Sequence, residues 1–95
     1  MNKDLKPTEE VGYRFRSFYI PKRMMYDIER YTNNRVLPGQ FLQAIISNNL
    51  REACARADDE NLQNLPAYVA YFYNRAPNGC WGSREIMNRW VANEN

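Results

Sequence analysis

Residues 13–57 read YRFRSFYIPKRMMYDIERYTNNRVLPGQFLQAIISNNLREACARA and contain the clearest structural signals of the chain. An aromatic run ends at Pro21, an amphipathic segment follows it, and a Pro-Gly break precedes a second and more apolar segment. Apolar side chains that recur every three or four residues are typical of helices. This order predicts a strand–helix–helix unit over residues 12–57.

The aromatic run from Tyr13 to Ile20 favours a short strand, because aromatic and β-branched residues are enriched in strands. Alternate residues of a strand point to opposite faces. One continuous strand would place Arg14, Arg16, Phe18 and Ile20 on one face and Tyr13, Phe15, Ser17 and Tyr19 on the other. The alternative for these residues is an extended segment that lies across helices.

Two helices are expected after the aromatic run. Pro21 suits a helix start, since its missing N–H would be unpaired there in any case. The first helix, residues 22–32, has one apolar stripe of Met24, Met25, Ile28 and Tyr31. The second begins after Pro38-Gly39 and carries a wide apolar face as far as Ala57, which predicts the centre of the core or of a dimer interface.

Residues 58–95 are expected to form a helical C-terminal extension. Asp58 and the two acidic residues after it suit the start of a new helix, because negative charge is favourable at a helix N-terminus; the alternative is that the preceding helix continues. A helix is expected at about residues 65–75, in which Pro66 either occupies the first turn after an Asn64 cap or kinks the helix. Ser83 is typical of the N-cap of a last helix.

The predicted fold class is therefore mainly α. A short N-terminal strand or extended segment is followed by three to four helices, and residues 12–95 form a single small domain. Residues 1–11 are polar and are expected to be a flexible arm. A chain of 95 residues buries only a modest core, so a homodimer would add stability.

The residue types present argue against catalysis and against a metal site. The chain has no histidine, which is the commonest general base and metal ligand. Its two cysteines, Cys54 and Cys80, lack the spacing of a zinc site. Cys54 lies on an apolar stripe and is interpreted as a core residue, whereas Cys80 is the better candidate for a reactive thiol. We expect no catalytic residues, no metal and no cofactor.

The apolar runs are far shorter than a membrane span, and the first ten residues lack the apolar core of a signal peptide. A soluble cytoplasmic protein is therefore expected. The net charge is only +2, but six basic and two acidic residues fall between Tyr13 and Arg35. A basic segment of this kind attracts either a nucleic acid or an acidic protein surface.

Residues 13–50 resemble the ribbon-helix-helix family of small dimeric DNA-binding proteins. Ile20-Pro21 would close the strand, and the two helices would contribute the core residues Met24, Met25, Ile28, Phe41, Leu42, Ile45 and Ile46. The resemblance implies a homodimer whose two strands pair and enter the major groove of DNA. The positions that read bases would be Phe15, Ser17 and Tyr19, of which the two aromatic residues depart from the polar or basic residues expected there.

Longer parts of the chain look like small proteins carried by tailed phages and prophages. The segments concerned are YIPKRMM, PGQFLQAI, ARADDEN and YFYNRAPNGCWGS. This resemblance implies a phage origin and the cytoplasm of a bacterial host, and it implies no particular activity.

Two hypotheses of non-enzymatic function follow. In the first and favoured one, a ribbon-helix-helix-like dimer binds nucleic acid through Arg14, Arg16, Ser17, Tyr19, Lys22, Arg23 and Arg35, since basic side chains contact phosphates. In the second, the protein is an inhibitor or adaptor that binds a host bacterial protein or defence complex. Its contacts would be Tyr68, Tyr71, Tyr73 and Trp81, because aromatic residues with polar tips are enriched at interfaces.

Overall fold

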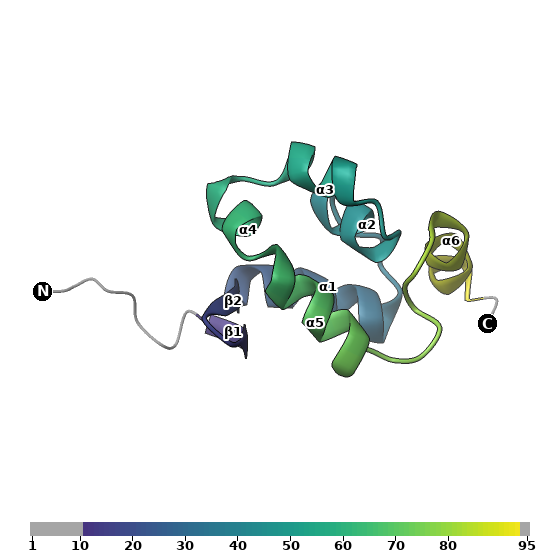
Figure 1. The fold of residues 1–95 in the computed structure, drawn as a ribbon. Coiled ribbons are helices and arrows are strands. Elements are labelled where there is room, and N and C mark those ends of the chain that lie inside the picture. Colours follow the sequence, from purple (N-terminus) through teal and green to yellow (C-terminus); the bar gives the residue numbers. More distant parts are fainter. Residues whose placement is uncertain (1–10, 94–95) are drawn as a thin grey trace, which may run out of the picture.

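A hairpin of two strands leads into a set of helices in the computed structural model, which describes residues 11–93 (Figure 1). The elements are β1 (Val11–Phe15), β2 (Phe18–Pro21), α1 (Lys22–Asn34), α2 (Gln40–Ile46), α3 (Leu50–Arg56), α4 (Asp59–Gln63), α5 (Leu65–Asn74) and α6 (Arg84–Ala92). The described part of the chain is therefore mainly helical, as the sequence predicts. The expected arm lies outside the described residues, except that Val11 already belongs to β1.

The aromatic run forms two paired strands where the sequence predicts one. β1 and β2 are antiparallel, with Tyr13 opposite Ile20 and Phe15 opposite Phe18. Because directly opposed residues share a face of the sheet, these four side chains lie on the same face. The expected separation of Tyr13 and Phe15 from Phe18 and Ile20 is therefore wrong.

The turn of the hairpin consists of Arg16 and Ser17. Arg16 has a positive φ of 57°, and Ser17 does not have a positive φ. A positive φ at the first of two turn residues is the pattern of a type II′ turn, where glycine is usual. The sequence offers no glycine or asparagine here, which is why its turn is not predicted.

α1 begins directly after Pro21 and buries Met25, Ile28 and Tyr31. It ends two residues later than expected, and Arg35 after it takes the left-handed conformation, with a φ of 59°. The Arg35 N–H donates to the carbonyl of Tyr31 at 3.0 Å. This contact closes the last turn of the helix, as in other left-handed helix ends.

The second predicted helix is divided into α2 and α3. Asn48 between them has a φ of 63°, which no helix accommodates. The side chain of Asn49 then accepts a hydrogen bond from the Glu52 N–H at 3.2 Å and caps α3. Asparagine favours such caps over helix interiors, so local side-chain chemistry ends one helix and begins the next.

The helix starts in the C-terminal part agree with the sequence. Asp58 accepts from the Asn61 N–H and caps α4, and Ser83 accepts from the Ile86 N–H and caps α6. Pro66 lies in the first turn of α5, where a missing N–H costs nothing. Pro66 therefore begins a helix and does not kink one.

One core joins these elements. The hairpin packs against α1 and α5, and α6 packs against α2 at the other end of the molecule (Figure 1). The fully buried large side chains are Tyr31, Tyr68, Phe72, Ile20, Ile28, Ile46, Met87 and Cys80. None of the helices between residues 11 and 93 is long and apolar enough to cross a membrane.

Candidate functional site

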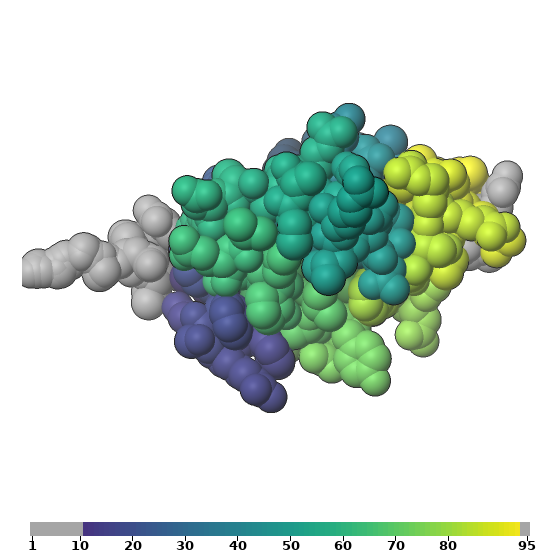
Figure 2. All heavy atoms as spheres, turned by 45° about the horizontal axis from the view of Figure 1, so that its top comes forward, coloured from purple at the N-terminus to yellow at the C-terminus, as the bar shows by residue number. Residues whose placement is uncertain are grey.

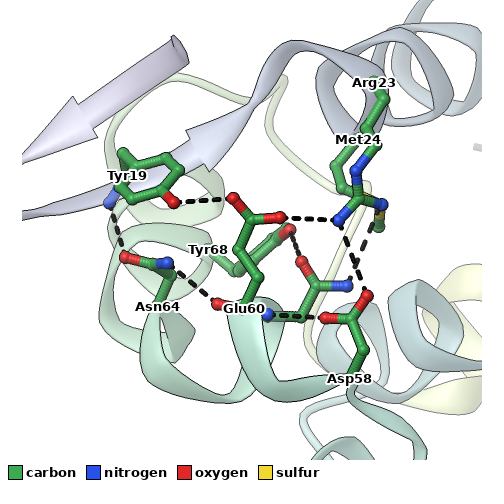
Figure 3. Close-up of polar contacts among 8 residues, drawn as sticks. Tyr19, Arg23, Met24, Asp58, Glu60, Asn64 and Tyr68 are labelled. Atoms are coloured by element: carbon green, nitrogen blue, oxygen red, sulfur yellow. Dashed lines mark hydrogen bonds and ion pairs between the residues drawn. The ribbon is translucent and has the colours of Figure 1, made fainter. Parts of the chain in front are cut away.

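A polar network fastens the hairpin to α4 (Figure 3). The Tyr19 hydroxyl donates to one carboxylate oxygen of Glu60 at 2.6 Å, and the Arg23 guanidinium donates to the other at 2.9 Å. The same guanidinium lies 3.5 Å from Asp58. Residues from β2, α1 and α4 therefore meet at a single carboxylate.

A second layer of the network is buried. The hydroxyl of Tyr68 donates to the side-chain oxygen of Asn61 at 2.6 Å. The side chain of Asn64 accepts from the Tyr19 N–H at 2.9 Å and donates to the Glu60 carbonyl at 2.8 Å. Buried polar groups are tolerated when they are hydrogen-bonded, and these groups are. The network thus links donors and acceptors from several elements and holds these elements together.

The protonation states in the network follow from the same contacts. The hydrogen bond from Tyr19, followed by the one from Arg23, lowers the pKa of Glu60. The bond to Glu60 in turn raises the pKa of Tyr19, and burial raises the pKa of Tyr68. At neutral pH the carboxylate is therefore ionised and both phenols keep their protons, which is the state in which every bond described above forms.

The structure does not bring together the residues predicted to bind nucleic acid. Tyr19 and Arg23 are engaged with Glu60, as described above. Arg35 stacks on the ring of Trp90 at 3.7 Å and donates to its carbonyl at 3.0 Å. Arg35 follows α1, a helix of 13 residues and hence about 20 Å long, whereas the hairpin precedes it. The remaining members of the set, Arg14, Arg16, Ser17 and Lys22, are exposed.

The four residues predicted to bind a protein also differ in their surroundings. Tyr68 is fully buried, so its expected place on a binding surface is wrong. Tyr71 is half-buried and packs edge-on against Tyr13, with ring centroids 5.3 Å apart. Trp81 is half-buried beside Phe72. Tyr73 is 79% exposed.

α5 presents an apolar edge to solvent. Its sequence, LPAYVAYFYN, has no charged side chain. This edge carries the half-buried Leu65 and the exposed Val69 and Tyr73, which are spaced by four residues and which we call the α5 ridge. Val69 is 47% exposed. The sequence of α5 contains the reason for this exposure. The helix has no charged side, and a small domain buries only one side of such a helix, so apolar side chains on the other side face solvent.

Two hollows flank the α5 ridge. The larger, of about 450 Å³, is lined by Phe15, Leu65, Pro66, Val69, Ala70, Tyr73 and Asn74. The smaller, of about 50 Å³, is lined by Ala44, Ile45, Asn48, Asn49, Leu50, Ala53, Leu65, Val69 and Trp81. In Figure 2 the hairpin (purple) and the end of α5 (light green) project side by side with a recess between them.

The lining of both hollows is almost entirely apolar. Among the described residues, no charged side chain lines either one. Leu50, at the rim of the smaller hollow, is 68% exposed. The ridge and the two hollows therefore form one apolar surface across α5, which is the best-developed candidate site of the molecule.

The cysteines do not form a site. Cys54 is exposed, so its expected place in the core is wrong. Cys80 is buried, and burial raises the pKa of its thiol to about 11. The Cys80 thiol therefore stays protonated at neutral pH, which counts against Cys80 as a candidate reactive thiol, because the thiolate is the nucleophile. Within residues 11–93 no cluster of three or more metal-ligating side chains occurs.

No protein-family model, no curated protein and no solved structure matches the chain.

Proposed function

We propose that this chain is a small, non-enzymatic binding protein that docks onto another protein through the α5 ridge and its two hollows. The observation that carries the proposal is the exposure of an uncharged helix edge, with Val69 at 47% and Tyr73 at 79%. Contiguous apolar patches on soluble proteins mark interaction sites more often than isolated apolar residues do.

The chemistry of the ridge favours a protein as the partner. Tyrosine is enriched among the residues that dominate binding energy, and it loses little conformational entropy when it is covered. Nucleic acid offers no comparable apolar surface to fill the larger hollow. The resemblance to phage proteins supports a host bacterial protein or defence complex as the target, with this chain acting as its inhibitor or adaptor in the bacterial cytoplasm.

Capture from bacterial lysate with paired variants tests the proposal. Val69→Asp and Tyr73→Asp place a charge on the ridge, whereas Leu37→Asp and Tyr26→Asp place one at residues of similar exposure, 48% and 64%, elsewhere. We expect the ridge variants to lose the partners that the wild-type chain retains and the control variants to keep them. Equal retention by all four variants would reject the ridge as the docking site.

A second candidate, nucleic-acid binding, is favoured by a separate observation. Arg14, Arg16 and Lys22 are exposed and form no ion pair with a carboxylate of residues 11–93. A two-stranded ribbon fits the major groove, and here one chain supplies both strands. In a homodimer, two such hairpins would bind neighbouring sites.

Binding to a DNA duplex at several salt concentrations tests this second candidate. If the hairpin arginines contact phosphates, Arg14→Ala with Arg16→Ala lowers the slope of log affinity against log salt by about 2, because each lost phosphate contact removes about 0.9 of slope. Light scattering with and without the duplex reports the mass of the complex. A chain that ignores the duplex at low salt is not a nucleic-acid binder of this kind.

A further inference from the structure

The α5 ridge has the shape against which another helix packs. Leu65, Val69 and Tyr73 follow one another at intervals of four residues, and such rows are the ridges that enter the groove of a partner helix. A hollow lies on each side of the row, and both are lined by Leu65 and Val69. A helix laid across the ridge would therefore place apolar side chains into both hollows.

Two arginines lie next to residues that line the larger hollow. The Arg16 guanidinium lies 5.1 Å above the ring of Phe15, which lines that hollow. The Arg75 guanidinium lies 5.8 Å above the ring of Tyr13, in the middle of the same strand, and Arg75 follows Asn74 of the lining. Neither arginine forms an ion pair with a carboxylate in the described part of the chain. Two arginines therefore lie next to lining residues of the larger hollow, Arg16 beside Phe15 and Arg75 beside Asn74, and Glu29 is the acidic residue that acts on Tyr71 together with Arg75.

We infer that the partner of the α5 ridge presents an amphipathic helix whose polar flank is acidic on the side that faces the hairpin. This inference rests on the proposed docking function and adds the chemistry of the docked segment. The apolar face of the helix would cover the ridge, and its carboxylates would meet Arg16 and Arg75. Complementary charge at the rim of an interface selects the partner and orients it.

A second copy of the chain fits the same surface less well. In a two-fold contact each copy offers the same patch to the other, so the arginines at both rims would share one interface. Like charges at close range are unfavourable, and no acidic side chain lines either hollow to offset them. The charge of the arginines therefore favours an acidic partner helix over a second copy of this chain.

Three synthetic helical peptides provide the probe. They share one Leu- and Phe-containing apolar face and carry Glu, Gln or Lys at all polar positions. Fluorescence anisotropy at low salt measures the binding of each peptide to the full chain. We expect the Glu peptide to bind about tenfold more tightly than the Gln peptide, since two exposed charge pairs are formed, and we expect salt to reduce this difference.

Variants of the chain identify the source of any preference. Arg16→Glu combined with Arg75→Glu should abolish or reverse the preference for the Glu peptide, while Arg30→Glu, at an arginine that borders neither hollow, should retain it. Val69→Asp should lower the affinity for all three peptides at least tenfold. Circular dichroism and thermal unfolding of each variant establish that its fold is intact.

Several results would overturn the inference. Equal affinity for the three peptides would show that the ridge binds helices without regard to charge, and the proposed docking function would stand. If none of the peptides binds, the inference of a helical partner is rejected. The capture experiment from lysate then still tests whether the ridge docks onto another protein. If Val69→Asp leaves the affinity for the Glu peptide unchanged, the peptide binds by electrostatic attraction alone and not through the ridge. If the chain is a dimer and Val69→Asp dissociates it, the ridge binds a second copy of the chain.

Discussion

At the scale of single residues, Glu60 is the acceptor on which the hairpin depends. It receives hydrogen bonds from Tyr19 and Arg23, and the Arg23 guanidinium also lies 3.5 Å from Asp58. Both contacts favour the ionised carboxylate and lower its pKa below the ordinary value of 4.5. Because the folded state binds the proton less tightly than the unfolded state, Glu60 stabilises the fold above that value and ceases to do so as the pH falls through its lowered pKa.

Replacement of Glu60 by Gln tests this linkage. Gln retains an acceptor for Tyr19 but carries no charge for Arg23, so we expect the free energy of unfolding to fall by about 1 kcal/mol or less at pH 7, as befits a half-exposed pair. The difference between wild type and Glu60→Gln should shrink as the pH is lowered from 7 to 3. Urea unfolding followed by circular dichroism measures it.

Glu85→Gln is the matched control, because Glu85 forms an exposed ion pair with Arg89 within one helix. Such pairs contribute about 0.3–0.5 kcal/mol, so the control should show only a small difference at every pH in the same range. An equal effect of the two substitutions at every pH would show that the network around Glu60 does not stabilise the hairpin.

At the scale of elements, the approach of the hairpin to α1 depends on Gly12. A β-carbon at this position would lie 2.2 Å from the Cγ and 2.8 Å from the Cβ of Met25. No side chain fits there without movement of β1 or α1. Gly12 also lies at the irregularity between Val11 and Tyr13 in the pairing of the two strands. Glycine in a strand often marks such a close approach of backbone to its neighbour.

Gly12→Ala should therefore destabilise the fold by about 1–3 kcal/mol, the range seen when side chains are forced into packed regions. Gly39→Ala is the control, since nothing lies within 4 Å of a β-carbon at that position. Its effect should stay within about 0.5 kcal/mol, because a poorer N-cap and a less flexible unfolded chain oppose each other. Thermal and urea unfolding of both variants provide the comparison, and similar losses in the two would refute the packing argument.

The elements that the sequence predicts correctly are those governed by neighbouring residues. Asp58 and Ser83 cap helices, and Pro66 opens one, because each acts on backbone groups within a few positions. The turn at Arg16 is missed because an arginine there adopts a positive φ that only the paired strands require. Interactions between neighbouring residues thus predict where helices begin, whereas the pairing of the two strands depends on contacts with the rest of the fold.

The candidate site is less predictable for the same reason. Tyr68 and Tyr73 lie on one helix and have the same side chain, yet one is buried and the other is 79% exposed. Tyr68 and Tyr73 differ in burial because α2 and the hairpin pack against only part of the surface of α5. When a helix is apolar on all sides, the spacing of its apolar residues does not predict which side will be buried. The exposure of Val69 has the same cause.

At the scale of the whole molecule, α6 is attached to the rest of the core through Trp90. Its indole N–H donates to the carbonyl of Tyr31 at 2.9 Å, and the guanidinium of Arg35 covers the ring. The segment before α6 is also tied down, because the Gly82 N–H donates to the carbonyl of Ile46 at 2.7 Å. These contacts join the C-terminal part to α1 and α2, so we expect the chain from the hairpin to α6 to unfold in one cooperative transition.

This cooperativity is tested by a substitution in the hairpin whose effect is measured by a probe in α6. In a Trp81→Phe background, Trp90 is the only tryptophan, so its fluorescence reports on the packing of α6 against α1, while circular dichroism reports on all helices. We expect the two signals to share one urea midpoint, and Gly12→Ala, in the hairpin, to lower both midpoints equally. Trp90 fluorescence that keeps its midpoint while the helical signal shifts would show that α6 unfolds independently. In that case the contacts of Trp90 with Tyr31 and Arg35 would not couple α6 to the hairpin.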